Sequence, residues 1–148
     1  MHLRSVSESN GTEKAAVLVG VNTFNSLLGE NVVATDRAGY PVEIFVRSQE
    51  SLNEISPSDS LNGIRHGYAD ASSDRCFISL SENLFAPGKS DILLSVIVHE
   101  LGHCAGLGHN GTSGKIMSEY PAGFSTYSPE TLAEFRADAR SAIDNSDH

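Results

Sequence analysis

Apolar residues recur at helical spacing in two separate parts of the chain. The first part, 15–28, is followed by Gly29, a residue type that often ends a helix, and its apolar stripe consists of Val17, Val21, Phe24 and Leu28. The second part begins with Ser128-Pro129-Glu130, which supplies a cap, a first-position proline and an early acid. The pattern predicts an amphipathic helix over 15–28 and a C-terminal helix after Ser128.

A third stretch is apolar on all sides. Apart from Ser95, every residue from 92 to 98 is apolar, and Ser90 and Asp91 stand before it as candidate caps. A helix without a polar face belongs in the interior of a protein. We therefore predict a buried helix that begins near residue 90.

Short segments rich in β-branched and aromatic residues predict strands. The polar stretch 48–63, with its many Ser, Asn and Asp residues, predicts a loop between them. Strands and helices together indicate an α+β fold. The expected strands are 3–6, 31–34, 42–46, 68–70 and 76–80.

The buried helix leads into a segment with candidate metal ligands. Residues 99–109 are HELGHCAGLGH. Side chains four apart share one face of a helix, so His99 and His103 can both reach one ion at roughly 2.0–2.1 Å. Glu100 is rotated by about 100° and points beside the ion, which suits a base acting on metal-bound water. The spacing predicts a zinc site of the H-E-x-x-H type.

A third histidine requires the helix to end. In an unbroken helix His109 would lie about 9 Å beyond His103 along the axis, too far to share the ion. Gly106 can adopt the left-handed conformation that ends a helix and reverses the chain. Three imidazole ligands with an open fourth position are typical of a catalytic zinc site. We expect one zinc ion.

These residues resemble a known family. The segment 99–109 looks like the zinc-binding consensus of the metzincin metallopeptidases, and Lys115-Ile116-Met117-Ser118 looks like their Met-turn. Met117 follows His109 at a spacing similar to that of the matrixin branch, and the resemblance implies a structural role for it. It also implies a twisted mixed sheet of about five strands, with an antiparallel edge strand near 67–71 that pairs with substrate. A backing helix, a zinc-site helix and a C-terminal helix would complete the fold.

The chain departs from the family pattern after the methionine. Matrixins have Tyr-Pro directly there, whereas Ser118 and Glu119 precede Tyr120 and Pro121 in this chain. We therefore assign no branch of the family. The expected substrate pocket lies near Tyr120, Pro121 and Phe124.

Two cysteines and one isolated histidine need separate interpretation. Cys76 and Cys104 permit one disulfide without requiring it. The resemblance places the strand that begins at Cys76 near the zinc-site helix, so either a strand-to-helix disulfide or two buried thiols fits.

His66 lies in a predicted loop, where a lone histidine is expected to be solvated.

Composition is consistent with a small enzyme. A chain of 148 residues with 39% hydrophobic residues can form one domain, which we divide into an upper subdomain, 1–110, and a lower one, 111–148. The net charge of −9 argues against a nucleic-acid partner, and no apolar run is long enough to span a membrane. We expect a monomer. The N-terminus has no apolar signal-peptide core, although the family resemblance favours a secreted or extracytoplasmic location.

The predicted reaction is hydrolysis of a peptide bond in a peptide or protein substrate. Glu100 would take a proton from the metal-activated water and pass it to the leaving amine. One alternative is a zinc amidase that acts on small or cell-wall amides, because its zinc ligands would be the same. The other is a zinc-binding module without turnover, which would not need Glu100.

Overall fold

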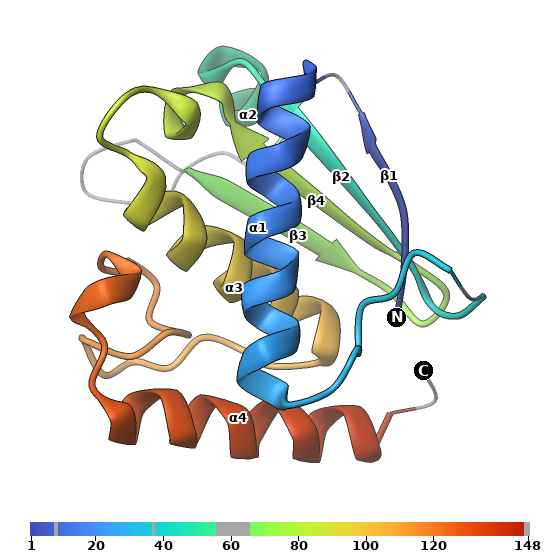
Figure 1. Cartoon of the computed structure of the whole chain (residues 1–148), viewed down its shortest axis with the longest axis vertical. Coiled ribbons are helices and arrows are strands. Elements are labelled where there is room, and N and C mark those ends of the chain that lie inside the picture. Colours follow the sequence, from blue (N-terminus) through green and yellow to red (C-terminus); the bar gives the residue numbers. More distant parts are fainter. Residues whose placement is uncertain (8, 37, 56–65, 147–148) are drawn as a thin grey trace.

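A computed structural model describes residues 1–7, 9–36, 38–55 and 66–146. One mixed sheet lies against two long helices, and a third long helix runs beneath them (Figure 1). The strands are β1 (His2–Ser7), β2 (Pro41–Arg47), β3 (Gly67–Ala71) and β4 (Cys76–Ser81). The helices are α1 (Gly11–Leu28), α2 (Gln49–Ile55), α3 (Ser90–Ala105) and α4 (Pro129–Asp144), with short 3₁₀ helices η1 (Glu82–Phe85) and η2 (Phe124–Thr126).

The sheet has the strand order β1-β2-β4-β3. Strands β1, β2 and β4 are parallel, and β3 runs antiparallel to β4 at the edge, with Gly67 opposite Leu80 and Ala71 opposite Cys76. Among the described residues β3 has no second strand partner. Its outer edge is therefore unpaired within that part of the chain, and its residues also contact helix α3.

The expected strand at 31–34 is wrong. Within the described ranges the sheet has four strands, and this segment contributes only an isolated bridge between Ala34 and His2. The side chain of Asn25, on α1, accepts a hydrogen bond from Val33 N and donates one to Val33 O, each at 2.9 Å. Because a side chain already satisfies these backbone groups, Val33 has none left for a ladder.

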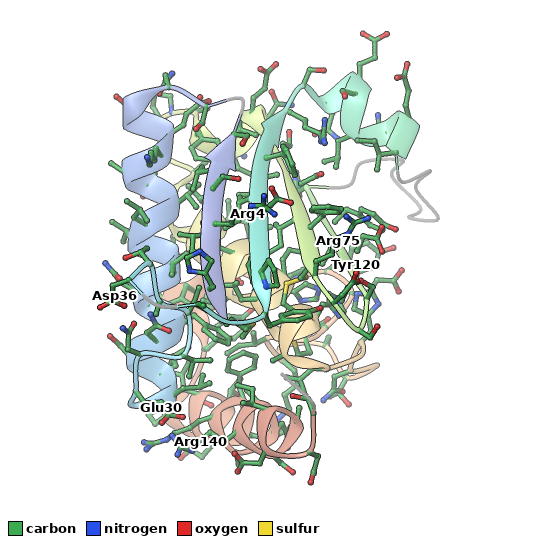
Figure 2. All side chains as sticks on the ribbon, turned by 90° about the vertical axis from the view of Figure 1, so that its right-hand side faces the viewer. Arg4, Glu30, Asp36, Arg75, Tyr120 and Arg140 are labelled. Carbon is green, nitrogen blue, oxygen red and sulfur yellow. A yellow bond between two sulfur atoms is a disulfide. The ribbon has the colours of Figure 1, made fainter. Side chains whose placement is uncertain are left out.

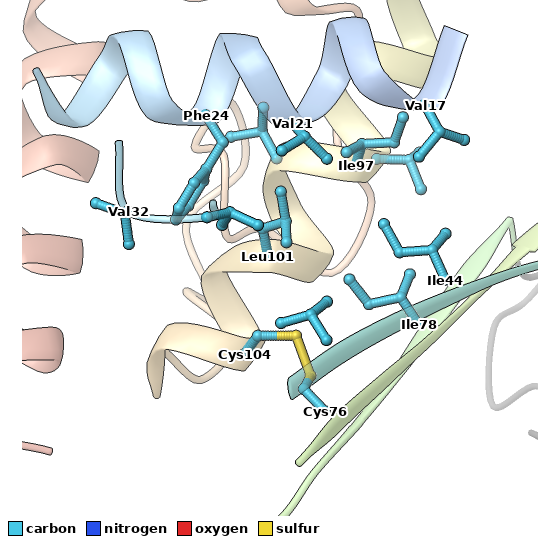
Figure 3. Close-up of a cluster of buried hydrophobic side chains, with 14 of the residues drawn as sticks. Val17, Val21, Phe24, Val32, Ile44, Cys76, Ile78, Ile97, Leu101 and Cys104 are labelled. Carbon is cyan, nitrogen blue, oxygen red and sulfur yellow. A yellow bond between two sulfur atoms is a disulfide. The ribbon is translucent and has the colours of Figure 1, made fainter. Parts of the chain in front are cut away.

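The core lies between the sheet and helices α1 and α3 (Figure 3). Alternate residues of β2 (Val42, Ile44 and Val46) are buried, as the period of two in a strand requires. Gly20 allows α1 to approach α3 closely, since a Cβ there would lie 2.6 Å from Ile97 Cδ1. The helix that carries the candidate ligands is thus fixed by packing on one side and by the sheet on the other.

Helix α4 is tied to the end of α1. Ser128 caps α4 as predicted, and Gly29 ends α1 with φ of 74°. Arg140 on α4 donates a hydrogen bond to Leu28 O at 2.5 Å and lies 3.5 Å from Glu30, and the two side chains meet below the sheet in Figure 2. This contact closes the lower layer under the core.

Two local predictions are wrong. Residues 49–55 form helix α2 where a loop was expected; Leu52 is its buried residue, and Ser48 Oγ accepts from Ser51 N at its start. The remainder of the expected loop, 56–63, lies outside the described residues. Helix α3 begins after Lys89 without a side-chain cap, so neither expected cap is used. In the described part of the chain, no helix has the length and apolar character needed to span a membrane.

Candidate metal centre

Helix α3 brings two imidazoles together on one face. His99 is buried and His103 half-buried, and their ring centroids lie 4.8 Å apart. The Nε2 atoms of the two rings approach to 3.2 Å. This is the neighbouring placement that a separation of four residues predicts for a helix.

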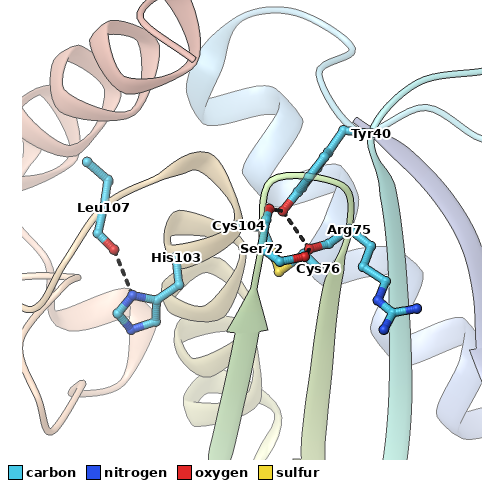
Figure 4. The surroundings of a disulfide bond; sticks show 7 residues. All are labelled: Tyr40, Ser72, Arg75, Cys76, His103, Cys104 and Leu107. Atoms are coloured by element: carbon cyan, nitrogen blue, oxygen red, sulfur yellow. Dashed lines mark hydrogen bonds between the residues drawn. A yellow bond between two sulfur atoms is a disulfide. The ribbon is translucent and has the colours of Figure 1, made fainter. Parts of the chain in front are cut away.

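Backbone carbonyls determine which nitrogen of each ring carries the proton. His99 Nδ1 lies 2.7 Å from Ile116 O. His103 Nδ1 lies 2.7 Å from Leu107 O, the contact drawn in Figure 4. A carbonyl oxygen only accepts, so each Nδ1 must be the donor. In the neutral rings both Nε2 atoms then hold lone pairs, and these face each other. Such an arrangement fits a cation between the rings, and carbonyl-bound imidazoles are the usual metal ligands.

The chain reversal after α3 delivers the third imidazole. Helix α3 ends at Ala105, and Gly106 has φ of 110°, the left-handed conformation expected there. Gly106 N donates to His103 O and Leu107 N to Gly102 O, which together form a Schellman-type end. His109 then lies with its ring centroid 5.3 Å from that of His99 and 4.8 Å from that of His103.

The three histidines form a group that could hold one metal ion. Their candidate ligand nitrogens all lie within 4.8 Å of one another. His109 is exposed, but its neighbour Asn110 donates a backbone hydrogen bond to Met117 O at 2.6 Å. Asn110 and Ser118 also form an isolated bridge. The exposed ligand is therefore positioned by backbone contacts on its C-terminal side.

Glu100 is buried beside the edge strand, with only 5% of its surface exposed. A Cβ on Gly67 would lie 2.8 Å from Val96 Cγ1 and 3.2 Å from Glu100 Oε1. Only glycine therefore permits this close approach of β3 to α3. The sequence analysis placed Gly67 only at the start of the expected edge strand, 67–71, and gave it no role beside Glu100; its one signal was a glycine at a strand start.

Met117 lies beneath the ligands. A Cβ on Gly102, which stands between the two helical histidines, would lie 2.6 Å from Met117 Sδ and 3.3 Å from Phe135. Met117 is 7% exposed and belongs to the hydrophobic core. The thioether thus fills the space under the helix turn that carries the imidazoles. The ring of Phe135, on α4, fills the space beside it.

The two cysteines are joined in a disulfide (Figure 4). The bond links the first residue of β4 to the residue after His103, and both cysteines are buried. Nearby, Tyr40 Oη donates toward the carbonyls of Ser72 and Arg75 in the turn that joins β3 to β4. Because both sulfurs are bonded to each other, Cys104 is not a candidate metal ligand.

A cavity of about 680 Å³ opens on the three histidines and Glu100. The edge strand β3 and the start of α3 line one part of it, and the segment 106–109 another. Tyr120, Pro121 and His66 also line it. Phe124 is not among the lining residues, and its ring centroid lies 6.0 Å from that of Tyr127.

The wall that contains Tyr120 is fixed to helix α3. Tyr127 Oη lies 2.8 Å from Ser95 Oγ in the interior and accepts from Ala122 N at 3.1 Å. Burial raises the pKa of Tyr127, against the opposing effect of its hydrogen bond with Ser95. Asp91 does not cap α3 but accepts from Ser125 N and Oγ, at 3.0 and 2.7 Å. Both contacts hold residues 122–127 against helix α3, next to Tyr120 and Pro121 of the cavity wall.

The comparisons with known proteins agree with this architecture. No family model matches the sequence, and no curated protein matches it significantly. Among solved structures, the chain is similar to an archaemetzincin from Methanopyrus kandleri, with a TM-score of 0.57. The two share 15% identity over 95% of this chain and 96% of that chain. The likeness shows a common α+β fold.

Proposed function

We propose that this chain is a zinc-dependent endopeptidase of the metzincin type. His99, His103 and His109 would hold one zinc ion, and Glu100 would act as general base and acid. The proposal treats 1–148 as a single catalytic domain, with 1–110 as the upper subdomain and 111–148 as the lower. Its main support is the pair of Nε2 atoms that face each other at 3.2 Å while both Nδ1 atoms are bonded to carbonyls.

The chemistry divides between the metal and the protein. When bound, zinc supplies a Lewis acid for the scissile carbonyl and makes a water molecule more acidic. Glu100 takes one proton as the water oxygen adds to the carbonyl carbon, and it donates that proton to the leaving nitrogen as the C–N bond breaks. The carbonyl groups of Ile116 and Leu107 keep the imidazoles oriented throughout.

The cavity favours a peptide over a small amide. Four residues of β3 line it (Gly67, Tyr68, Ala69 and Ala71), and β3 pairs on one side with β4. An extended peptide can add to the free edge of a strand through its backbone groups. A small amide would make no use of that edge, which is why we prefer the endopeptidase over the amidase.

The proposal also assigns roles after His109. Met117, packed against Gly102, would serve as the Met-turn methionine, a structural support rather than a ligand. Tyr120 is 59% exposed and lines the cavity with Pro121, so both would contact substrate.

One experiment tests the function. Purified protein loaded with zinc is incubated with a diverse peptide mixture, alone and with a chelator, and the products are identified by mass spectrometry. We expect cleavage that the chelator abolishes and that zinc restores. The Glu100→Gln variant should keep its zinc and lose activity by a factor of about 10²–10⁴. Cleavage that survives chelation, or none by a zinc-loaded protein, would refute the proposal.

A further inference from the structure

The cavity wall carries one acidic side chain outside the metal centre. Of the residues that line the cavity, Glu119 and Glu100 are the only carboxylates, and no lysine or arginine of the described chain lines it. His66 is the other histidine on the wall beyond the three of the metal centre. Partial burial and the nearby Lys89 lower the pKa of His66, which disfavours a positive charge on its ring. Glu119 is therefore the carboxylate that this wall presents away from Glu100 and the three histidines.

The backbone that carries Glu119 is fixed at both ends. Ser118, directly before it, forms a bridge with Asn110, next to the third candidate ligand. Ala122 is held by Tyr127 Oη, which also contacts the buried Ser95. The backbone of Glu119 is thus held at the cavity wall before any substrate arrives.

The carboxylate of Glu119 is available for a ligand. Its side chain is exposed, and in the described part of the chain it forms no ion pair or hydrogen bond. The nearest basic residue along the chain, Lys115, is already bound to Glu134 at 2.7 Å. An acidic group without a cation of its own, on the wall of a cavity that no lysine or arginine of the described chain lines, fits a positively charged substrate group.

We propose that Glu119 selects peptides that carry a cationic group close to the scissile bond. This inference rests on the proposed peptidase function and names its substrate class. The cation is a lysine or arginine side chain, since an endopeptidase cleaves away from the free N-terminus and a carboxylate forms charge-assisted hydrogen bonds with both side chains. The net charge of −9 adds a weaker, long-range attraction for such substrates.

The test compares peptides that differ in one charge. Fluorogenic peptides of one sequence, all with an acetylated N-terminus, carry Lys or Gln at each of the two positions on either side of the scissile bond. For the wild type we expect kcat/KM to favour one Lys position by about 2–5-fold, the range of an exposed ion pair. Glu119→Gln should abolish that preference, and Glu119→Lys should reverse it. High salt should weaken it as well.

A matched control separates this local effect from net charge. Glu54→Gln removes the same charge from an exposed position on α2 that does not line the cavity, so the preference should remain. The inference is overturned if the wild type shows no preference, or if Glu119→Gln and Glu54→Gln behave alike. Fluorescence anisotropy with the same labelled peptides isolates binding. Selective binding of the cationic peptide without any cleavage would refute the peptidase and leave selection by Glu119 standing.

Discussion

The two halves of the candidate metal centre are built in different ways. His99, Glu100 and His103 stand on helix α3, which is buried and joined to the sheet by the disulfide from Cys104. His109 stands on an exposed irregular segment that follows Gly106 and is positioned by backbone contacts. The first half gains its precision from packing, and the second from one glycine and a few hydrogen bonds. Replacing a residue of the first half should therefore lower the stability of the fold. Replacing one of the second half should mainly weaken metal binding.

The sharpest test of this difference replaces one ligand from each half. His99→Ala and His109→Ala should each weaken zinc binding at least 100-fold. Removing a group that only hydrogen-bonds to a metal ligand already lowers metal affinity about 10–100-fold, and these variants remove the ligand itself. Only His99→Ala should also lower the melting temperature of the zinc-free protein, by about 5–10 °C, because it empties a buried site. Zinc titration and thermal denaturation measure the two effects. Equal melting temperatures for the two variants would contradict the comparison.

Removing the disulfide should destabilise the helix half. Its cysteines are 28 residues apart, and closing a loop of that length in the unfolded chain is worth about 3–4 kcal/mol. We expect Cys76→Ala/Cys104→Ala to lower the free energy of unfolding by about this amount in urea denaturation. An unchanged midpoint would show that the bond contributes little beyond the surrounding core.

Gly106→Ala tests the reversal between the halves. Alanine in the left-handed region costs about 1–2 kcal/mol, and any relief of that strain would move His109. The variant should lose stability and bind zinc more weakly. Gly108→Ala is the matched control, since a Cβ there meets nothing within 4 Å, and it should remain within about 0.5 kcal/mol of wild type. Zinc titration and urea denaturation of both variants would show whether the conformation of Gly106 matters.

The smallest expected effect concerns the wall opposite the edge strand. Tyr127→Phe removes the hydroxyl that contacts Ser95 and Ala122, which should cost about 1 kcal/mol and raise KM more than it lowers kcat. Because burial raises the pKa of Tyr127, its contribution is present below about pH 10 and is lost as the pH rises above that value. The stability gap between wild type and variant should therefore narrow in alkaline urea denaturation. A gap that widens would contradict this account.

Local rules predicted the helix ends and the motif well. Gly29 and Gly106 end their helices, and Ser128 caps α4, because each of these features depends on a few neighbouring residues. The placement of His99 beside His103 likewise follows from helix geometry alone.

Contacts between distant residues explain the failures. The strand expected at 31–34 is lost to the Asn25 side chain on α1, and Asp91 bonds to Ser125 instead of capping its own helix. The role of Gly67 depends on how near β3 comes to Glu100, a distance that no local pattern contains. Such contacts exist only once the chain has folded.

The methionine under the ligands also has a chemical liability. Met117 Sδ has no spare room on the side of Gly102, and Met117 belongs to the hydrophobic core. Oxidation by peroxide would add a polar oxygen to this thioether, and the sulfoxide would push against the helix turn that carries both imidazoles. Storage under oxidising conditions should therefore inactivate the protein even though the disulfide itself is already oxidised, and methionine sulfoxide reductases would be the enzymes to reverse it.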